Sequence, residues 1–343
     1  MTFFTQFRKI ARSGAIAATT GGSLYYSSPL HSAPIAHCSN NLSTVNPFLQ
    51  QNGLPQFSQY KASDVKPAVE LCISEQKDRF SKLETLIDSN KNGFTFESIV
   101  EEVEKIQAPL SYTWGAVNHL MGVNNSDDLR AAHDAVQGAV VEASQAAGQS
   151  LPLYNALKFL ENTPTIWDKL DEAQKRIVDS SVKQMVRSGV ALTGDAKAKF
   201  NALQVEASEL STKFSNNVLD STKKFQLLIT DRNEIDGLPE SSRGLASQQA
   251  VKNGHPSSTP ENGPWLLTLD MPSYLPSMQH IKSRAVRETL YRAFVTRASS
   301  GESDNSEVIR RILRIKQEMA EILVFILHCV SENAILQKYL GVF

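Results

Sequence analysis

Histidines are the first residues of this chain to consider for metal binding or proton transfer, and there are seven of them. A zinc hydrolase of the HExxH type needs two histidines one helical turn apart to hold the metal, with a glutamate beside the first to activate water. No histidine here is followed by glutamate, and no two are four residues apart. We therefore expect no catalytic and no metal-binding residue among them. The seven are His31, His37, His119, His133, His255, His280 and His328.

One histidine pair and the cysteines leave weaker alternatives. His119 and His133 fall on different predicted helices and could meet in space, but two imidazoles without nearby carboxylates would make a poor metal site. The cysteines are Cys38, Cys72 and Cys329, an odd and widely spaced set without a CxxC pair. This spacing indicates neither a disulfide framework nor a thiolate zinc site, and it fits a reducing compartment.

Other catalytic and nucleic-acid-binding patterns are absent from the sequence. It contains no G-x-S-x-G elbow, no Walker loop and no G-x-G-x-x-G. The acidic run at 101–105 could bind basic peptides, but a solvated helix face with internal ion pairs fits it better. Arginines between 284 and 314 are mixed with glutamates and lack interleaved aromatics. With a net charge of -1 and no long apolar run, the chain is expected to bind neither nucleic acid nor a membrane.

The first 45 residues have the composition of an organellar import peptide. The first acidic residue is Asp64, whereas Arg8, Lys9 and Arg12 occur early and serine and threonine are frequent. Basic, Ser-rich and acid-poor segments of this kind direct import into mitochondria or chloroplasts, and the pattern does not distinguish the two. We expect a disordered transit peptide over 1–45, with the mature chain beginning between 39 and 46. The alternative is an unstructured tail that carries no targeting signal.

From residue 46 onward, the hydrophobic spacing predicts a series of up-and-down helices. Ser63, Thr95 and Ser126 are of the residue types that cap a helix start, and Pro109 is expected to end or kink the helix that it interrupts. Ser306 is expected to cap the last helix. The buried stripe of the first long helix is Val69, Ile73, Phe80, Leu83 and Ile87, and that of the last is Ile309, Ile312, Ile315, Met319 and Leu323.

The stretch 200–230 joins a long helix to a strand. Polar residues at 215–217 (Ser-Asn-Asn) are weak helix formers, so we expect hydrogen bonds to a neighbouring helix or, as the alternative, to a ligand. Short apolar runs at 225–230 and 265–270 predict two strands that pair with each other across a long polar loop. The predicted buried face of the helix is Phe200, Leu203, Ala207, Leu210, Phe214 and Val218.

The same stretch carries a resemblance to a known family. The blocks LSTKFSNNVLDST (210–222) and LLTLDMPSYLPSM (266–278) resemble the thimet oligopeptidase and oligopeptidase A family of zinc metallopeptidases, closest to its plant organellar members. The blocks RETLYRAF (287–294), TRAS (296–299), DNS (304–306) and EMA (318–320) extend the similarity in matching order. It covers roughly 46–325, and the tail at 326–343 does not resemble the family.

The resemblance implies a mostly α-helical fold. It corresponds to the multi-helix N-terminal half of a neurolysin-like fold over 46–325, with a small two-stranded antiparallel element at 225–230 and 265–270. In the full-length family, it also implies two helical halves around a channel for short peptides, with zinc held by the second half. Because the HExxH half has no counterpart here, no zinc ligand or catalytic residue is carried over and no cofactor is expected in this chain. Its peptide-contacting residues are unknown.

Two hypotheses for function come from different classes. The first is a truncated, inactive form of an organellar zinc oligopeptidase that degrades short peptides, including cleaved import peptides, in mitochondria or the chloroplast stroma. The second is a non-catalytic helical module that binds peptides or pairs with a full-length sister chain, since its helices pack in sequence order and could fold alone. A monomer that melts cooperatively would favour the module. Aggregation through exposed apolar surface would favour the fragment.

Overall fold

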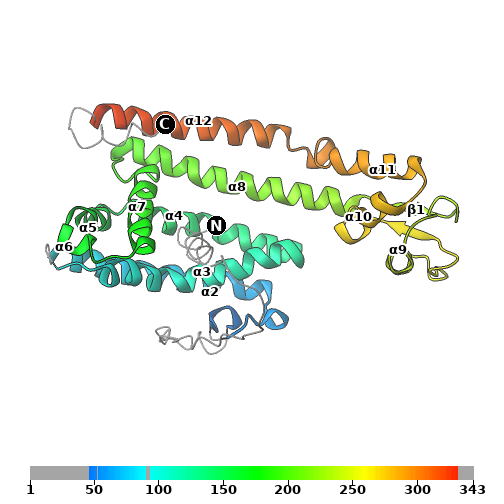
Figure 1. Cartoon of the computed structure of the whole chain (residues 1–343), viewed down its shortest axis with the longest axis horizontal. Coiled ribbons are helices and arrows are strands. Elements are labelled where there is room, and N and C mark those ends of the chain that lie inside the picture. Colours follow the sequence, from blue (N-terminus) through cyan, green and yellow to red (C-terminus); the bar gives the residue numbers. More distant parts are fainter. Residues whose placement is uncertain (1–45, 52, 90–92, 331–343) are drawn as a thin grey trace, which may run out of the picture. The chain divides into compact units, whose positions relative to one another are not determined.

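The computed structural model describes residues 46–51, 53–89 and 93–330, with 324–330 described by their backbone alone. The expected transit peptide at 1–45 and most of the expected tail at 326–343 lie outside the described residues. The described chain forms two compact units, residues 46–209 with 318–330, and residues 210–317. Helices predominate in both, which confirms the mostly α-helical fold (Figure 1). In the described part of the chain, no helix has the length and hydropathy to cross a membrane.

The first unit is a bundle built on long helices. Three of them, α2, α3 and α4, pack against one another, and α5 packs on both α2 and α7 (Figure 1). Its elements are η1 (Pro47–Leu49), η2 (Phe57–Gln59), α2 (Ala62–Ser89), the π-helical η3 (Glu97–Glu101), α3 (Glu102–Val123), α4 (Asp127–Gly148), α5 (Leu151–Asn162), α6 (Pro164–Trp167), α7 (Glu172–Arg187) and the first part of α8 (Gly194–Lys224).

Two clusters of buried side chains form the core of this unit. One lies around α5 and α7 and includes Leu160, Val178 and Met185. The other lies between α2, α3 and α4 and includes Val69 and Val117. Each such side chain contributes about 1.5–3 kcal/mol when fully buried. All five residues of the stripe predicted for the first long helix are buried, which confirms that prediction.

Helix starts in this unit follow the predicted capping residues, with one exception. Ser126 Oγ accepts a hydrogen bond from the backbone N–H of Leu129 at 3.2 Å and so caps α4. Thr95 Oγ1 accepts from the N–H of Ser98 at 3.2 Å before η3 and α3. The prediction for Ser63 was wrong because α2 begins at Ala62, which places Ser63 inside its first turn.

Residues 46–51 are held against the bundle by buried hydrogen bonds. Asn46 Oδ1 accepts from Phe48 N at 3.0 Å, while Asn46 Nδ2 donates to Asp64 O at 2.8 Å. Thr113 Oγ1 in α3 donates to Phe48 O at 3.1 Å. Because the Phe48 ring is fully buried and stacks on Tyr60 with centroids 4.1 Å apart, this irregular segment is part of the core.

Pro109 lies inside α3, so of the two expected effects, an end or a kink of the helix, the end is ruled out. Proline has no N–H, which leaves the carbonyl of Lys105, four residues earlier, without its helical donor. Arg79 of α2 supplies the donor instead, because its Nη1 lies 3.2 Å from Lys105 O. Its Nη2 pairs with Glu102 at 3.2 Å. The neighbouring helix thus compensates for the bond that the proline removes.

The second unit combines a small sheet with short helices. β1 and β2 pair antiparallel, with Leu228 opposite Leu266. This confirms the predicted two-stranded element, within narrower limits. Between and after the strands lie two helices, α9 and α10, that the sequence did not predict. The elements are the last part of α8, β1 (Leu227–Ile229), α9 (Glu240–Lys252), β2 (Trp265–Leu267), α10 (Met271–His280), α11 (Arg284–Val295), η4 (Gly301–Ser303) and the first part of α12 (Ser306–Val330).

The core of the second unit lies between β2 and the short helices. Trp265 and Leu290 are fully buried there, and α9 packs on β2. The buried residues of α9 are the small Ala246, Ser247 and Ala250, which allow its backbone to approach the strand. Because this buried face consists of alanine and serine and not of large apolar residues, hydrophobic spacing did not reveal the helix.

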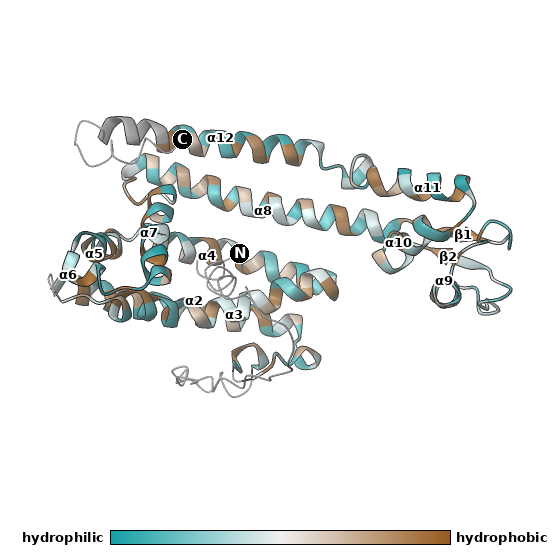
Figure 2. Cartoon of the chain, viewed as in Figure 1, coloured by the Kyte–Doolittle hydropathy of each residue, from teal (hydrophilic) through white to brown (hydrophobic). Residues whose placement is uncertain are grey.

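The long stripes predicted for α8 and α12 are buried only in part. The first three residues of the α8 stripe are buried, but Phe214 is 37% exposed and Leu210 and Val218 are half-buried. In α12, Ile309 is 44% exposed, and Val308 is buried next to it. Figure 2 shows hydrophobic residues recurring along both helices. Periodicity identifies an amphipathic face, whereas burial also requires a neighbour that covers it.

Candidate functional site

Neutral polar side chains join α8 to the connection between α11 and α12 in the second unit. Asn217 Nδ2 donates to Asn305 Oδ1 at 2.8 Å, and Asn305 Nδ2 donates to Phe214 O at 3.1 Å. Asn305 is 2% exposed, so these bonds satisfy a buried amide. The expected partner was a neighbouring helix, but Asn217 bonds to the connection just before α12, which begins at Ser306. Ser215 Oγ instead donates to Ser211 O within its own helix.

This polar network continues one turn further along α8. Ser221 Oγ accepts from the N–H of Ala298 at 3.1 Å, and Thr222 Oγ1 accepts from Arg297 Nη1 at 3.3 Å. Ala298 has a φ of 51°, a left-handed conformation that residues other than glycine rarely adopt. Its carbonyl accepts from the N–H of Asn305 at 2.9 Å. Hydrogen bonds to both the N–H and the C=O of Ala298 therefore hold this unusual backbone conformation in place.

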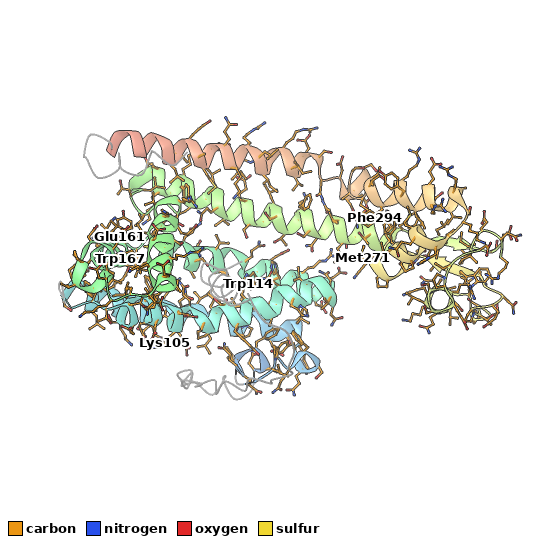
Figure 3. All side chains as sticks on the ribbon, viewed as in Figure 1. Lys105, Trp114, Glu161, Trp167, Met271 and Phe294 are labelled. Carbon is orange, nitrogen blue, oxygen red and sulfur yellow. The ribbon has the colours of Figure 1, made fainter. Side chains whose placement is uncertain are left out.

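An aromatic pair lies beside the network. The Arg297 guanidinium lies 3.6 Å from the ring centroid of Phe294, and Phe294 stacks on Tyr274 with centroids 4.1 Å apart. Figure 3 labels Phe294. Arg297 Nε also donates to Phe294 O at 2.8 Å. Arg297 therefore contacts α8 and α11 together, and through the ring of Phe294 it is linked to α10.

The network is suited to positioning segments and not to proton transfer. Amides, hydroxyls and a guanidinium bind peptide groups well, but none of them is a base near neutral pH. Asp304, next to it in sequence, accepts from the N–H of Ser306 at 2.9 Å, and hydrogen bonds from Ser306 lower the pKa of its carboxyl group. Asp304 thus caps α12. Ser306, the predicted cap, is the first residue of the helix.

The two histidines weighed as a pair have separate surroundings in the first unit. His133 is 2% exposed and its ring stacks on Trp114 with centroids 4.6 Å apart (Figure 3). Its Nδ1 lies 3.3 Å from Asp134 Oδ1. Burial lowers the pKa of His133 below its ordinary value, although Asp134 acts in the opposite direction. His119 is exposed and lies against Phe57, with ring centroids 4.9 Å apart.

The His and Cys side chains that the structure describes lie in surroundings that do not suit a zinc ion. In the described ranges, no group of three or more His, Cys, Asp or Glu side chains lies close enough together to hold a metal. Burial raises the pKa of the Cys72 thiol to about 11, so the thiol stays protonated, and only the thiolate binds zinc. His255 lies in a loop and His280 ends α10. The candidates outside the described side chains are His31, His37, Cys38, His328 and Cys329.

The acidic run at 101–105 forms ion pairs within and between helices. Lys105 Nζ lies 4.0 Å from Glu101 and 3.9 Å from Glu102, and Arg79 of α2 also pairs with Glu102. These side chains are partly or largely exposed. This confirms the interpretation as a solvated helix face, with pairs that contribute about 0–1 kcal/mol each.

Comparison with known proteins places these features in a family context. A profile of the family described as "Neurolysin/Thimet oligopeptidase, N-terminal domain" matches residues 69–197. The chain is 44% identical over 278 residues to "Probable cytosolic oligopeptidase A" and to "Organellar oligopeptidase A, chloroplastic/mitochondrial", both from Arabidopsis thaliana. It is 35% identical over 289 residues to "Oligopeptidase A" of Haemophilus influenzae.

The matched regions cover most of this chain but a smaller share of each relative. The two Arabidopsis matches include 81% of this chain, with 39% of the first relative and 34% of the second. The Haemophilus match includes 83% of this chain and 40% of that protein. The chain therefore spans less than half the length of the curated relatives that it matches.

Proposed function

Because this chain belongs, through its helical N-terminal region, to the thimet oligopeptidase and oligopeptidase A family, we propose that it forms the N-terminal part of a peptidase that acts on short peptides. The observation that carries the proposal is the 44% identity over 278 residues to two plant oligopeptidases. An alignment of 278 residues in a chain of 343 includes parts of both compact units. Support for the peptidase function comes from the relatives, since the network itself has no proton-transfer group.

Within this proposal, peptide-bond hydrolysis is zinc-dependent, and its metal ligands are not among these 343 residues. The full sequence contains no HExxH motif, and the described His, Cys, Asp and Glu residues do not form a metal-binding cluster. The two helical units then provide a scaffold for the catalytic region and a wall for its peptide channel. By itself, the chain is an inactive form.

The substrates and the location follow the organellar branch of the family. One of the two Arabidopsis relatives is named as chloroplastic and mitochondrial, and the basic, acid-poor segment at 1–45 is of the type that directs import. We therefore assign the chain to a mitochondrion or a chloroplast stroma, with short peptides, including cleaved import peptides, as the substrate class.

A chimera tests the proposed peptidase role. Residues 46–325 of this chain would replace the matched region of the Arabidopsis organellar oligopeptidase A, and hydrolysis of a quenched fluorescent peptide would be measured. Chelator-sensitive hydrolysis within about tenfold of the parent enzyme is the expected result, because the replaced region is a scaffold. A folded chimera that binds zinc like the parent but does not cleave the peptide would contradict the proposal.

The inactivity of the chain alone needs a separate measurement. The purified chain, incubated with zinc and desalted, is expected to retain far less than one zinc ion per molecule and to leave the fluorescent peptide intact. The Arabidopsis enzyme, treated in parallel, is the positive control. One tightly bound zinc ion together with chelator-sensitive cleavage would refute this part of the proposal. In that case the metal ligands would have to lie in the chain itself.

A further inference from the structure

The first unit contains a partly open pocket where several helices meet, with the exposed Ser144 at its edge. Its walls come from α2, the π-helical η3, α3, α4, α5 and α7, and they are mainly apolar, with Val103, Leu157 and Met185 among the lining residues. The centres of water-sized molecules have about 40 Å³ available inside it. One water molecule needs about 10–15 Å³ by this measure, so the pocket has room for about two or three.

A buried hydroxyl group without a partner lines this pocket. Ser181 on α7 is 1% exposed, and its Oγ has no hydrogen-bond partner among the described residues. Ser144, which also lines the pocket, differs because its Oγ donates to Val140 O at 3.0 Å in its own helix. A buried hydroxyl that has left water normally keeps a partner, and a bound water molecule commonly fills that role.

Further polar groups line the same pocket. Gln76 of α2 is 6% exposed, and its carboxamide forms no hydrogen bond with another described residue. Gln107 and Ser111 of α3 are half-buried and likewise lack a described partner. A water molecule needs two to four polar partners to remain in a protein interior. The lining of this pocket offers that number, on three different helices.

From this combination of volume and unpaired polar groups, we infer that the pocket is a binding site for a small cluster of ordered water molecules. One water bonds to Ser181 Oγ, and the cluster links it to the carboxamide of Gln76 and towards the polar groups of α3. The bridge connects α7 to α2 and α3 through hydrogen bonds that no direct side-chain contact supplies. The volume excludes a ligand of metabolite size.

A crystal structure of the full chain at high resolution tests the inference directly. We expect ordered solvent density within hydrogen-bonding distance of Ser181 Oγ, and we expect xenon under pressure to be absent from the pocket, because xenon enters dry apolar cavities. Xenon density in the pocket would overturn the inference. A Ser181 hydroxyl rotated onto a carbonyl of its own helix, with no solvent density beside it, would do the same.

Two serine variants, one at the buried Ser181 and one at the exposed Ser144, provide a second test in solution. Ser181→Ala removes a hydroxyl that the inference assigns to a water cluster, whereas Ser144→Ala removes one that is satisfied by its own helix. If the cluster is present, Ser181→Ala lowers the Tm below that of Ser144→Ala, because the water loses a partner. If the pocket is dry, removing an unpaired hydroxyl relieves a cost. A Tm of Ser181→Ala at or above that of Ser144→Ala therefore contradicts the inference.

Discussion

At the scale of single residues, the groups that could react or titrate near neutral pH serve the fold. The Cys72 thiol is buried beside Thr113, with 3.6 Å between Sγ and Oγ1, and its raised pKa keeps it protonated. The His133 ring fills the space against Trp114. Both residues were considered as ligands because of their type alone. Their surroundings show that each contributes to packing in the neutral form.

The buried His133 predicts that the protein loses stability on mild acidification. Because burial lowers its pKa in the folded state, the unfolded chain binds a proton more readily below about pH 6.5. The contribution of the neutral His133 to the free energy of unfolding is present in full above pH 6.5 and is lost as the pH falls towards the folded-state pKa. Urea unfolding between pH 5 and 8 should show this slope, with Asp134 as the nearby group that moderates it.

Two variants distinguish the effect of His133 on stability from that of the other groups that titrate between pH 5 and 8. His133→Phe keeps a ring for stacking on Trp114 and should reduce the dependence of stability on pH between 5 and 6.5. His119→Gln changes an exposed histidine and serves as the control. An unchanged slope in His133→Phe would show that other groups cause the acid sensitivity.

At the scale of elements, the Asn305 network determines how the α11–α12 connection lies on α8. Asn305→Ala should destabilise the second unit by about 1–3 kcal/mol, because it removes a buried amide and leaves the Phe214 carbonyl and the Asn217 amide without this partner. A double-mutant cycle with Asn217→Ala should show coupling, since both residues share one bond. Urea unfolding measures both effects. Ser215→Ala on the same helix is the control, and an equal loss there would contradict a specific role for Asn305.

Two glycines in the second unit allow the cost of backbone strain to be distinguished from the cost of a steric clash. Gly237 has a φ of 91°, and a Cβ at this position would lie 2.1 Å from the carbonyl oxygen of His280. Gly254 has a φ of 94°, and a Cβ there would have no atom within 4 Å. Gly254→Ala should therefore cost about 1–2 kcal/mol for its φ alone. Gly237→Ala should cost clearly more, because the segment that carries Gly237 must also move away from the end of α10.

Chemical unfolding followed by Trp265 fluorescence, in a background with Trp114 and Trp167 replaced by phenylalanine, measures both glycine variants. Because the two φ values are nearly equal, the difference in unfolding free energy between the two variants measures the cost of the clash at Gly237. Equal losses in the two variants would indicate that the segment carrying Gly237 can shift away from α10 without cost.

Local signals in the sequence predicted the elements of the first unit better than those of the second. Ser126 and Thr95 cap helices through bonds to residues three positions away, which a local pattern can reveal. Burial of α9 instead depends on small residues facing β2. The continuation of α3 through Pro109 depends on a donor from Arg79 on another helix. Such effects depend on tertiary contacts, so no local sequence pattern predicts them.

At the scale of the whole molecule, the sequence indicated the α8 side of the candidate network but not its partners. The polar run at 215–217 indicated a specific bond, but Asn305 lies 88 residues from Asn217, and Arg297 lies 75 residues from Thr222. A single sequence does not pair residues at such separations. Both ends of each bond nevertheless lie in the blocks 210–222, 296–299 and 304–306, which resemble the oligopeptidase family.

The separate cores of the two units lead to a prediction about cooperativity. Leu160 is fully buried in the core of the first unit, and Leu160→Ala should cost that unit about 2–5 kcal/mol. Hydrogen exchange followed by mass spectrometry should then show faster exchange across α2 to α7, while β1, β2 and α9 keep the protection seen in the parent chain. Gly237→Ala should produce the opposite pattern. Because the unit boundary falls within α8 and α12, amides of these helices are expected to respond to both variants. Faster exchange throughout the chain in either variant would show that the two cores unfold as one, and the N-terminal region would then be a single cooperative domain.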